Sequence, residues 1–168
     1  MPPRSVVLIG FMAAGKTEVG RALATRLRFE FCDTDAMVAA AAGRTVEEIF
    51  AADGEQGFRV LEREAVVLAA ARPGRVVACG GGAVLSVRNY GVLKGAGPIV
   101  YLRTSAEELI ARLGRGDGRP LLGDDPAEAV PRMLSERAPA YETAADLVVD
   151  TDARSPDEVA SEIAERLP

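Results

Sequence analysis

The chain has 168 residues, of which 48% are hydrophobic and 27% are charged, and this balance is typical of one soluble globular domain with an adequate core. Its formal net charge of −5 argues against general nucleic-acid binding, and its apolar runs are much shorter than a membrane span. The N-terminus has no signal-peptide core, so we expect a cytoplasmic protein with neither nucleic acid nor membrane as a partner. Because the chain contains no histidine, any general base would be an aspartate or a glutamate.

Five short apolar runs predict buried strands, and longer segments with helical periodicity separate them. The expected strands are Val6–Gly10, Phe29–Cys32, Val76–Cys79, Ile99–Leu102 and Leu147–Val149. The expected helices are Lys16–Leu27, Val46–Ala52, Phe58–Ala71, Ala106–Leu113, Pro126–Tyr141 and Asp157–Leu167. Strands that alternate with helices imply a mostly parallel sheet covered on both faces. The pattern therefore predicts a single α/β domain over residues 1–168.

The most informative motif directly follows the first predicted strand. Residues 10–17 read G-F-M-A-A-G-K-T, a glycine-bounded loop that exposes backbone N–H groups to phosphate at the start of a helix. Lys16 can then reach the terminal phosphates of a nucleotide, and the Thr17 hydroxyl can bind Mg²⁺. An accidental glycine-rich turn is a poor alternative, because Lys16 is one of only two lysines in a chain whose other basic residues are arginines. The motif predicts binding of a nucleoside triphosphate.

Two further motifs follow the second and third predicted strands. Asp33 and Asp35 stand in a D-T-D sequence, at the edge of the sheet where α/β proteins bind ligands. One carboxylate could hold a metal-bound water while the other accepts a proton from an attacking hydroxyl, although a helix cap is the simpler alternative. Gly80–Gly82 would let the backbone approach a ligand closely and present N–H donors to it, although a flexible hinge would also use glycine.

Two arginines and one loop are candidates for contact with substrate. Arg59 and Arg137 could each pair with a glutamate nearby on the helix, or bind a substrate carboxylate through the guanidinium fork. The glycine-rich, charged stretch 114–125 is interpreted as a lid that closes over phosphates, with an ordinary surface loop as the alternative. Cys32 and Cys79 are expected to be small buried residues at strand ends, with a redox pair as the alternative.

In this order and spacing the motifs resemble those of the shikimate kinases, and the resemblance runs nearly end to end. The features that carry it are G-F-M-A-A-G-K-T (10–17), D-T-D (33–35), D-G-E-Q-G-F-R (53–59), G-G-G (80–82), R-P-L-L (119–122), R-A-P-A-Y (137–141) and T-D-A-R-S-P (151–156). The resemblance implies a three-layer P-loop fold like the nucleoside monophosphate kinases, with a five-stranded parallel sheet and helices on both faces. It also implies a lid at about 112–125 and a helical substrate-binding region at about 33–60.

The implied reaction is transfer of the γ-phosphate of ATP to the 3-hydroxyl of shikimate, a step toward chorismate and the aromatic amino acids. The resemblance makes Asp35 the residue that binds the substrate hydroxyls and acts as base, and Arg119 the lid arginine that approaches the transferred phosphate. Together with Lys16 these form the implied catalytic set. The implied substrate-binding residues are Asp35, Arg59, Gly80, Gly81, Gly82 and Arg137, with the two arginines gripping the carboxylate.

ATP, shikimate and Mg²⁺ are the implied ligands. Thr17 would bind the Mg²⁺ directly and Asp33 would lie near it through water. Arg112 and Arg154 correspond to positions that flank the adenine. The implied ATP-binding residues are Ala13, Ala14, Gly15, Lys16, Thr17, Arg112, Arg119 and Arg154. We expect the enzyme to be a monomer.

One position departs from the family pattern, and two other functions stay open. Ala13 stands where the family usually has glycine, and a methyl group is tolerable there only at a negative φ, so the sequence leaves the conformation of the loop at this position open. A related kinase acting on gluconate or a cyclitol is the nearest alternative, but an uncharged cyclitol would leave Arg59 and Arg137 without a partner. A nucleotide-binding regulatory module without catalysis is the other, although Lys16 and Asp35 are both present.

Overall fold

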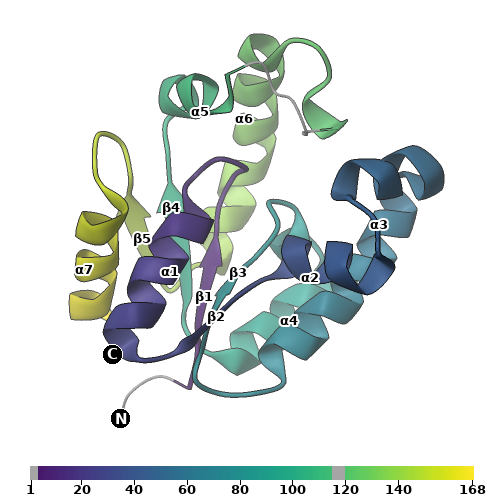
Figure 1. Cartoon of the computed structure of the whole chain (residues 1–168). Coiled ribbons are helices and arrows are strands. Elements are labelled where there is room, and N and C mark those ends of the chain that lie inside the picture. The colour runs from purple at the N-terminus through teal and green to yellow at the C-terminus, as the bar shows by residue number, and fades with distance from the viewer. Residues whose placement is uncertain (1–3, 115–119) are drawn as a thin grey trace.

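A five-stranded parallel sheet forms the middle layer of the computed structural model, which describes residues 4–114 and 120–168 (Figure 1). The strand order β2-β3-β1-β4-β5 places β1 at the centre, between β3 and β4. The strands are β1 (Val6–Ile9), β2 (Glu30–Asp33), β3 (Arg75–Ala78), β4 (Ile99–Arg103) and β5 (Leu147–Asp150). The predicted α/β class and all five predicted strands are therefore confirmed.

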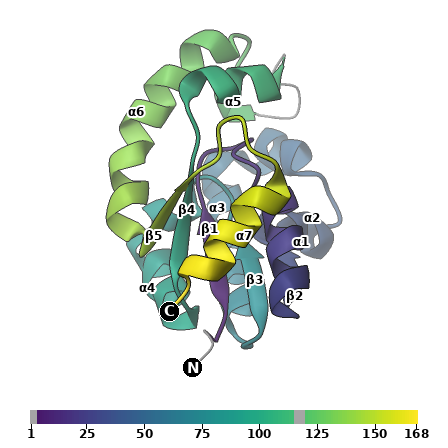
Figure 2. The same cartoon turned by 90° about the vertical axis from the view of Figure 1, so that its left-hand side faces the viewer.

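Helices cover both faces of this sheet (Figure 2). The helices are α1 (Lys16–Leu27), α2 (Thr34–Ala42), α3 (Val46–Ala70), α4 (Val87–Ala96), α5 (Ala106–Leu113), α6 (Pro126–Ala144) and α7 (Pro156–Arg166), with short 3₁₀ turns η1 (Ala83–Leu85) and η2 (Pro120–Leu122). On one face α1 packs beside α7, and on the other α3 and α6 flank α4 (Figures 1 and 2). Within residues 4–114 and 120–168, none of these helices has the length and apolar character to cross a bilayer.

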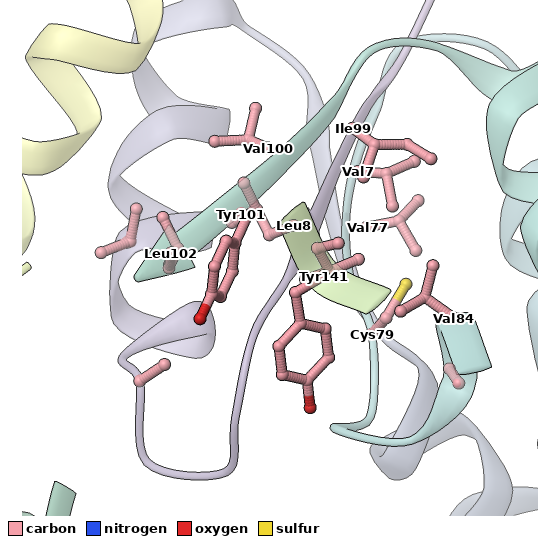
Figure 3. Close-up of a cluster of buried hydrophobic side chains, with 14 of the residues drawn as sticks. Val7, Leu8, Val77, Cys79, Val84, Ile99, Val100, Tyr101, Leu102 and Tyr141 are labelled. Atoms are coloured by element: carbon pink, nitrogen blue, oxygen red, sulfur yellow. The ribbon is translucent and has the colours of Figure 1, made fainter. Parts of the chain in front are cut away.

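The core lies on both sides of β1, whose four residues are each at most 1% exposed. Because both faces of the sheet are covered, the central strands are continuous apolar runs instead of alternating ones. Figure 3 shows Val7 of β1 beside Val77 of β3 and Ile99 of β4. Helix α6 adds Tyr141, whose ring is fully buried against Tyr101 of β4 with centroids 5.1 Å apart.

Three helical features differ from the prediction, each for a local reason. The two segments predicted at 46–52 and 58–71 belong to one α3, interrupted at Gly54, which has φ 70 and ψ −176. The helix α2 was not predicted, because after its first two residues it is an apolar run with no polar face to reveal a helical period. The helix α4 was not predicted either, because its glycines at 91 and 95 weaken the helical signal.

The two cysteines lie on neighbouring strands but are free thiols. Cys32 of β2 pairs in register with Val77 of β3, so Cys79 is its diagonal neighbour two residues further along. Diagonal neighbours in a sheet lie about 7–8 Å apart, beyond the Cα separation that a disulfide spans. Burial also raises the pKa of the Cys79 thiol well above its ordinary value. The structure therefore favours packing over redox chemistry for this pair.

Gly97 allows the end of α4 to pass directly over the backbone that enters β1. A Cβ built on Gly97 would lie 1.9 Å from the Ser5 carbonyl oxygen, whereas one built on Gly95 meets nothing within 4 Å. The backbone at Gly97 is extended, with φ 165, so an L-residue there would suffer from the overlap alone.

Gly97→Ala should lower the free energy of unfolding, measured by urea denaturation, by about 2–4 kcal/mol. The matched control Gly95→Ala should raise it by about 0.5–1 kcal/mol through better helix propensity; equal effects of the two substitutions would contradict this packing.

Candidate active site

The loop between β1 and α1 has the backbone geometry of a phosphate-binding loop. Gly10 has φ 149, and a Cβ there would lie 2.8 Å from the carbonyl oxygen of Leu102. Gly15 has φ 93 and caps the N-terminus of α1, whose partial positive charge favours an anion at this point. The Lys16 ammonium folds over the loop and donates to the carbonyls of Gly10 and Phe11, both at 2.8 Å. Sequence and structure therefore agree on a phosphate cradle at the carboxyl end of β1.

The structure settles the conformation at Ala13, which the sequence left open. A methyl group was considered tolerable there only at a negative φ, but Ala13 has φ 65, in the left-handed region. That conformation costs a residue with a Cβ about 1–2 kcal/mol. Arg112 of α5 helps to hold it, since its Nη1 donates to the Ala13 carbonyl at 3.2 Å. The loop thus keeps a glycine-like backbone without a glycine, and surrounding contacts offset the strain.

Ala13→Gly should relieve this strain. The substitution removes the left-handed penalty but adds flexibility to the unfolded chain, so we expect a net gain of about 0.5–1 kcal/mol in the free energy of unfolding. The control Ala14→Gly changes a neighbouring loop residue that is buried and does not have a positive φ, and it should destabilise the protein. Urea denaturation of both variants provides the measurement. A loss of stability in Ala13→Gly as large as that in Ala14→Gly would show that Ala13 is not strained.

Asp33, at the end of β2, caps the next helix and also contacts the first turn of α1. Its Oδ2 accepts a hydrogen bond from the Thr17 hydroxyl at 3.0 Å, so a carboxylate stands beside the first turn of α1. Its Oδ1 accepts from the backbone N–H groups of Asp35 at 2.9 Å and Ala36 at 3.2 Å, which caps α2. The cap fixes Asp35 in the first turn of α2. Both carboxylates line the same cleft.

The Gly80–Gly82 loop follows β3, and each of its glycines faces a charged side chain from another element. A Cβ built on Gly80 would lie 2.5 Å from Asp35 Oδ1, one on Gly81 would lie 3.5 Å from Arg137 Nη1, and one on Gly82 would lie 2.4 Å from Arg59 Nη2. We predicted these glycines for close approach to a ligand. The structure adds a second reason, because the missing side chains make room for the residues predicted to bind that ligand.

Arg59 is oriented by two glutamates of α3. Its Nη1 contacts Glu62 Oε1 at 2.8 Å and its Nη2 contacts Glu55 Oε1 at 3.2 Å. Glu62 is only 1% exposed, and this burial raises the pKa of its carboxyl while the facing Arg59 opposes the rise. The ion pair considered as an alternative for Arg59 therefore exists, and it holds the guanidinium against Gly82.

Arg112 and Arg154 lie on the other side of the phosphate loop. Besides its bond to Ala13, Arg112 donates to the carbonyl of Thr151 at 3.4 Å and pairs with Glu108 at 3.1 Å. Arg154 donates to the carbonyl of Asp150 at 2.9 Å. These contacts join α5, the phosphate loop and the connection between β5 and α7 along one wall of the cleft.

The predicted site residues gather along two contiguous cavities. A cleft of about 950 Å³ runs over the phosphate loop, and a neighbouring cavity shares Met12, Asp35, Val46 and Gly81 with it. The cleft is lined by Ala13, Ala14, Gly15, Lys16, Thr17, Asp33, Asp35, Gly80, Gly81, Arg112 and Arg154. The second cavity is lined by Asp35, Arg59, Gly81, Gly82 and Arg137. Arg119 lies outside the described residues, and the predicted lid is described only at 112–114 and 120–125.

Several residues of the second cavity were not predicted as site residues. Val46, Phe50 and Phe58 line it from α3, and Leu121 of η2 lines it as well. The helical stripe of α3 predicted only a core, because an apolar side chain facing a cavity has the same periodicity as one facing the core. No motif indicated the burial of Glu62, which depends on how α3 packs against β3.

Together, a phosphate loop at the carboxyl edge of a parallel sheet, a carboxylate and two arginines in a joined cavity define an ATP-dependent small-molecule kinase of the P-loop class. A family model described as shikimate kinase matches residues 12–168. Accordingly, the chain belongs to the shikimate kinase family.

Individual relatives agree with this assignment over nearly the whole chain. A shikimate kinase of Symbiobacterium thermophilum is 47% identical over 167 residues, covering 97% of this chain and 95% of the relative. A shikimate kinase of Thermobifida fusca is 46% identical, covering 96% of this chain and 94% of the relative. Among solved structures, shikimate kinase from Acinetobacter baumannii in complex with shikimate is similar with a TM-score of 0.93 and 36% identity, covering 98% of this chain and 92% of that one.

Proposed function

We propose that this chain transfers the γ-phosphate of ATP to the 3-hydroxyl of shikimate, giving shikimate 3-phosphate and ADP. The observation that carries the proposal is the convergence of Arg59 and Arg137 on the Gly80–Gly82 loop, beside Asp35 and in a cavity joined to the phosphate cleft. Two guanidinium groups on one wall suit a carboxylate, and a nearby acid suits an alcohol. Shikimate carries both groups. Similarity to shikimate kinases over nearly the whole chain supports the same acceptor.

Mg²⁺ is the proposed metal, and the donors near the phosphate loop fit it. Thr17 and Asp33 place a hydroxyl and a carboxylate 3.0 Å apart at the start of α1. The described residues contain no cluster of three or more metal-ligating side chains, which agrees with a Mg²⁺ held mainly by phosphate and water oxygens. When bound, the ion would neutralise charge on the β- and γ-phosphates. Thr17 would bind it directly, and Asp33 would orient one of its waters.

The remaining roles follow from position. Lys16 would exchange its bonds to the Gly10 and Phe11 carbonyls for the β- and γ-phosphates. Asp35 would orient the attacking hydroxyl and accept its proton, while Arg59 and Arg137 grip the carboxylate and align that hydroxyl with the phosphate.

The wall of the cleft and the lid complete the proposed site. Arg112 and Arg154 would flank the adenine, and Arg119 would bring positive charge to the transferred phosphate when the lid at 112–125 closes. The substrate-binding region would span about 33–60 within a single domain. We further propose that the enzyme acts as a cytoplasmic monomer, with neither nucleic acid nor membrane as a partner.

The proposed acceptor is tested by ADP release from Mg·ATP with shikimate, gluconate, a neutral cyclitol or no acceptor. We expect release that depends on shikimate and is at least tenfold slower with each alternative, because only shikimate matches both the arginine pair and the position of Asp35. Lys16→Ala serves as the control for ADP formed by a contaminant, since it should abolish turnover.

Each other outcome has a defined meaning. Turnover with gluconate alone would keep the kinase and the arginine pair but overturn shikimate as the acceptor. Turnover with the neutral cyclitol alone would also overturn the carboxylate-binding role of Arg59 and Arg137. ATP binding without turnover of any acceptor would favour the regulatory module.

A further inference from the structure

Tyr141 connects the helix that carries Arg137 to the backbone of the Gly80–Gly82 loop. It lies one turn after Arg137 on α6, and its side chain is fully buried beside Tyr101 (Figure 3). Its hydroxyl donates a hydrogen bond to the carbonyl oxygen of Gly81. Burial raises the pKa of this hydroxyl, so the phenol keeps the proton that it donates. A single helix therefore supplies both a substrate-binding arginine and an anchor for the loop facing it.

A second hydroxyl anchors the preceding peptide. The backbone N–H of Gly80 donates to the Thr34 side chain at 2.9 Å in a fully buried contact. The Gly80 carbonyl accepts from the N–H of Ala83 at 3.0 Å. Gly80 is thus held independently of α6, whereas the carbonyl of Gly81 is held by Tyr141. The peptide between Gly81 and Gly82 is the part of the loop whose orientation depends on the Tyr141 hydroxyl.

The direction of that carbonyl decides what the next N–H can reach. The peptide bonds of the described residues are trans, and in a trans peptide the C=O and N–H groups point in opposite directions. When Tyr141 draws the Gly81 carbonyl toward α6, the N–H of Gly82 turns away from α6. Gly82 lines the second cavity together with Arg59, on the side where the acceptor carboxylate would lie.

Resting on the function proposed above, we propose that Tyr141 is a positioning residue that presents the Gly82 N–H to the acceptor carboxylate between Arg59 and Arg137. Glycine on both sides makes this peptide easy to rotate, so a bond from outside the loop is needed to select one orientation. Without that hydroxyl the carboxylate would lose a preorganised backbone donor, and Arg137, which also hydrogen-bonds the hydroxyl, would lose one of its contacts. The described contacts of Tyr141 do not include the phosphate loop, so nucleotide binding should not depend on its hydroxyl.

Tyr141→Phe tests the proposal, because it keeps the buried ring and removes only the hydroxyl. We expect the KM for shikimate, and its Kd by titration calorimetry, to rise about five- to twentyfold, as for the loss of one hydrogen bond that leaves a buried carbonyl unsatisfied. The kcat and the KM for ATP should change less than twofold. The matched control is Tyr101→Phe, which removes a hydroxyl from the neighbouring ring that makes no bond to the loop among the described residues. This control should leave the KM and Kd for shikimate, the kcat and the KM for ATP within twofold of their values in the unmodified enzyme.

The outcomes separate this inference from the proposed function. If the unmodified enzyme shows no shikimate-dependent ADP release, the proposed function itself fails. If that enzyme is active and Tyr141→Phe binds shikimate as tightly, the positioning role is overturned. If Tyr141→Phe lowers the kcat, the affinity for shikimate and the affinity for ATP together, and also lowers the melting temperature, the positioning role is likewise overturned in favour of a structural role. A selective loss of shikimate affinity in Tyr141→Phe, absent in Tyr101→Phe, would support it.

Discussion

The site depends on a close approach of backbone to charged side chains, because a side chain at Gly80 would overlap Asp35 and one at Gly82 would overlap Arg59. Because the loop has no Cβ atoms, a carboxylate and two guanidinium groups from α2, α3 and α6 can converge on one strand end. Buried polar groups at such close quarters must satisfy one another. Glu62 does this for Arg59, and Thr34 and Tyr141 do it for the loop backbone.

The parallel sheet explains why these elements meet. The strands β2, β3 and β1 are neighbours that end at the same edge, so Asp33, the glycine loop and the phosphate loop lie side by side along that edge. Hydrogen bonds then link the separate loops, as between Thr17 and Asp33 or between Arg112 and Ala13. The cleft over the phosphate loop and the second cavity are therefore two parts of one surface. The left-handed Ala13 shows that the surrounding structure sets the loop conformation even against the preference of a residue within it.

Much of this arrangement could be predicted because it depends on order along the chain. Buried strands appear as apolar runs, and parallel topology brings the loops at their carboxyl ends to one edge, so the motifs at 10–17, 33–35 and 80–82 indicate one site before any coordinates are known. The features that could not be predicted depend on packing between distant elements. The burial of Glu62, the cavity-facing side of α3 and the bond from Tyr141 to Gly81 are of this kind. The conformation of Ala13 could not be predicted either, because contacts from outside the loop, such as the bond from Arg112, hold it against the intrinsic preference of alanine.

Gly82→Ala tests the central claim most directly, namely that the loop is bare so that Arg59 can hold the acceptor carboxylate. Gly82 has φ −102, which alanine adopts without strain, so the added methyl group acts through its overlap with the guanidinium alone. Titration calorimetry should show shikimate binding weakened about tenfold or more, with ATP binding unchanged, because Arg59 is displaced from the cavity wall. Unchanged affinity for shikimate would contradict the account, since the space beside Gly82 would then have no role in binding the acceptor.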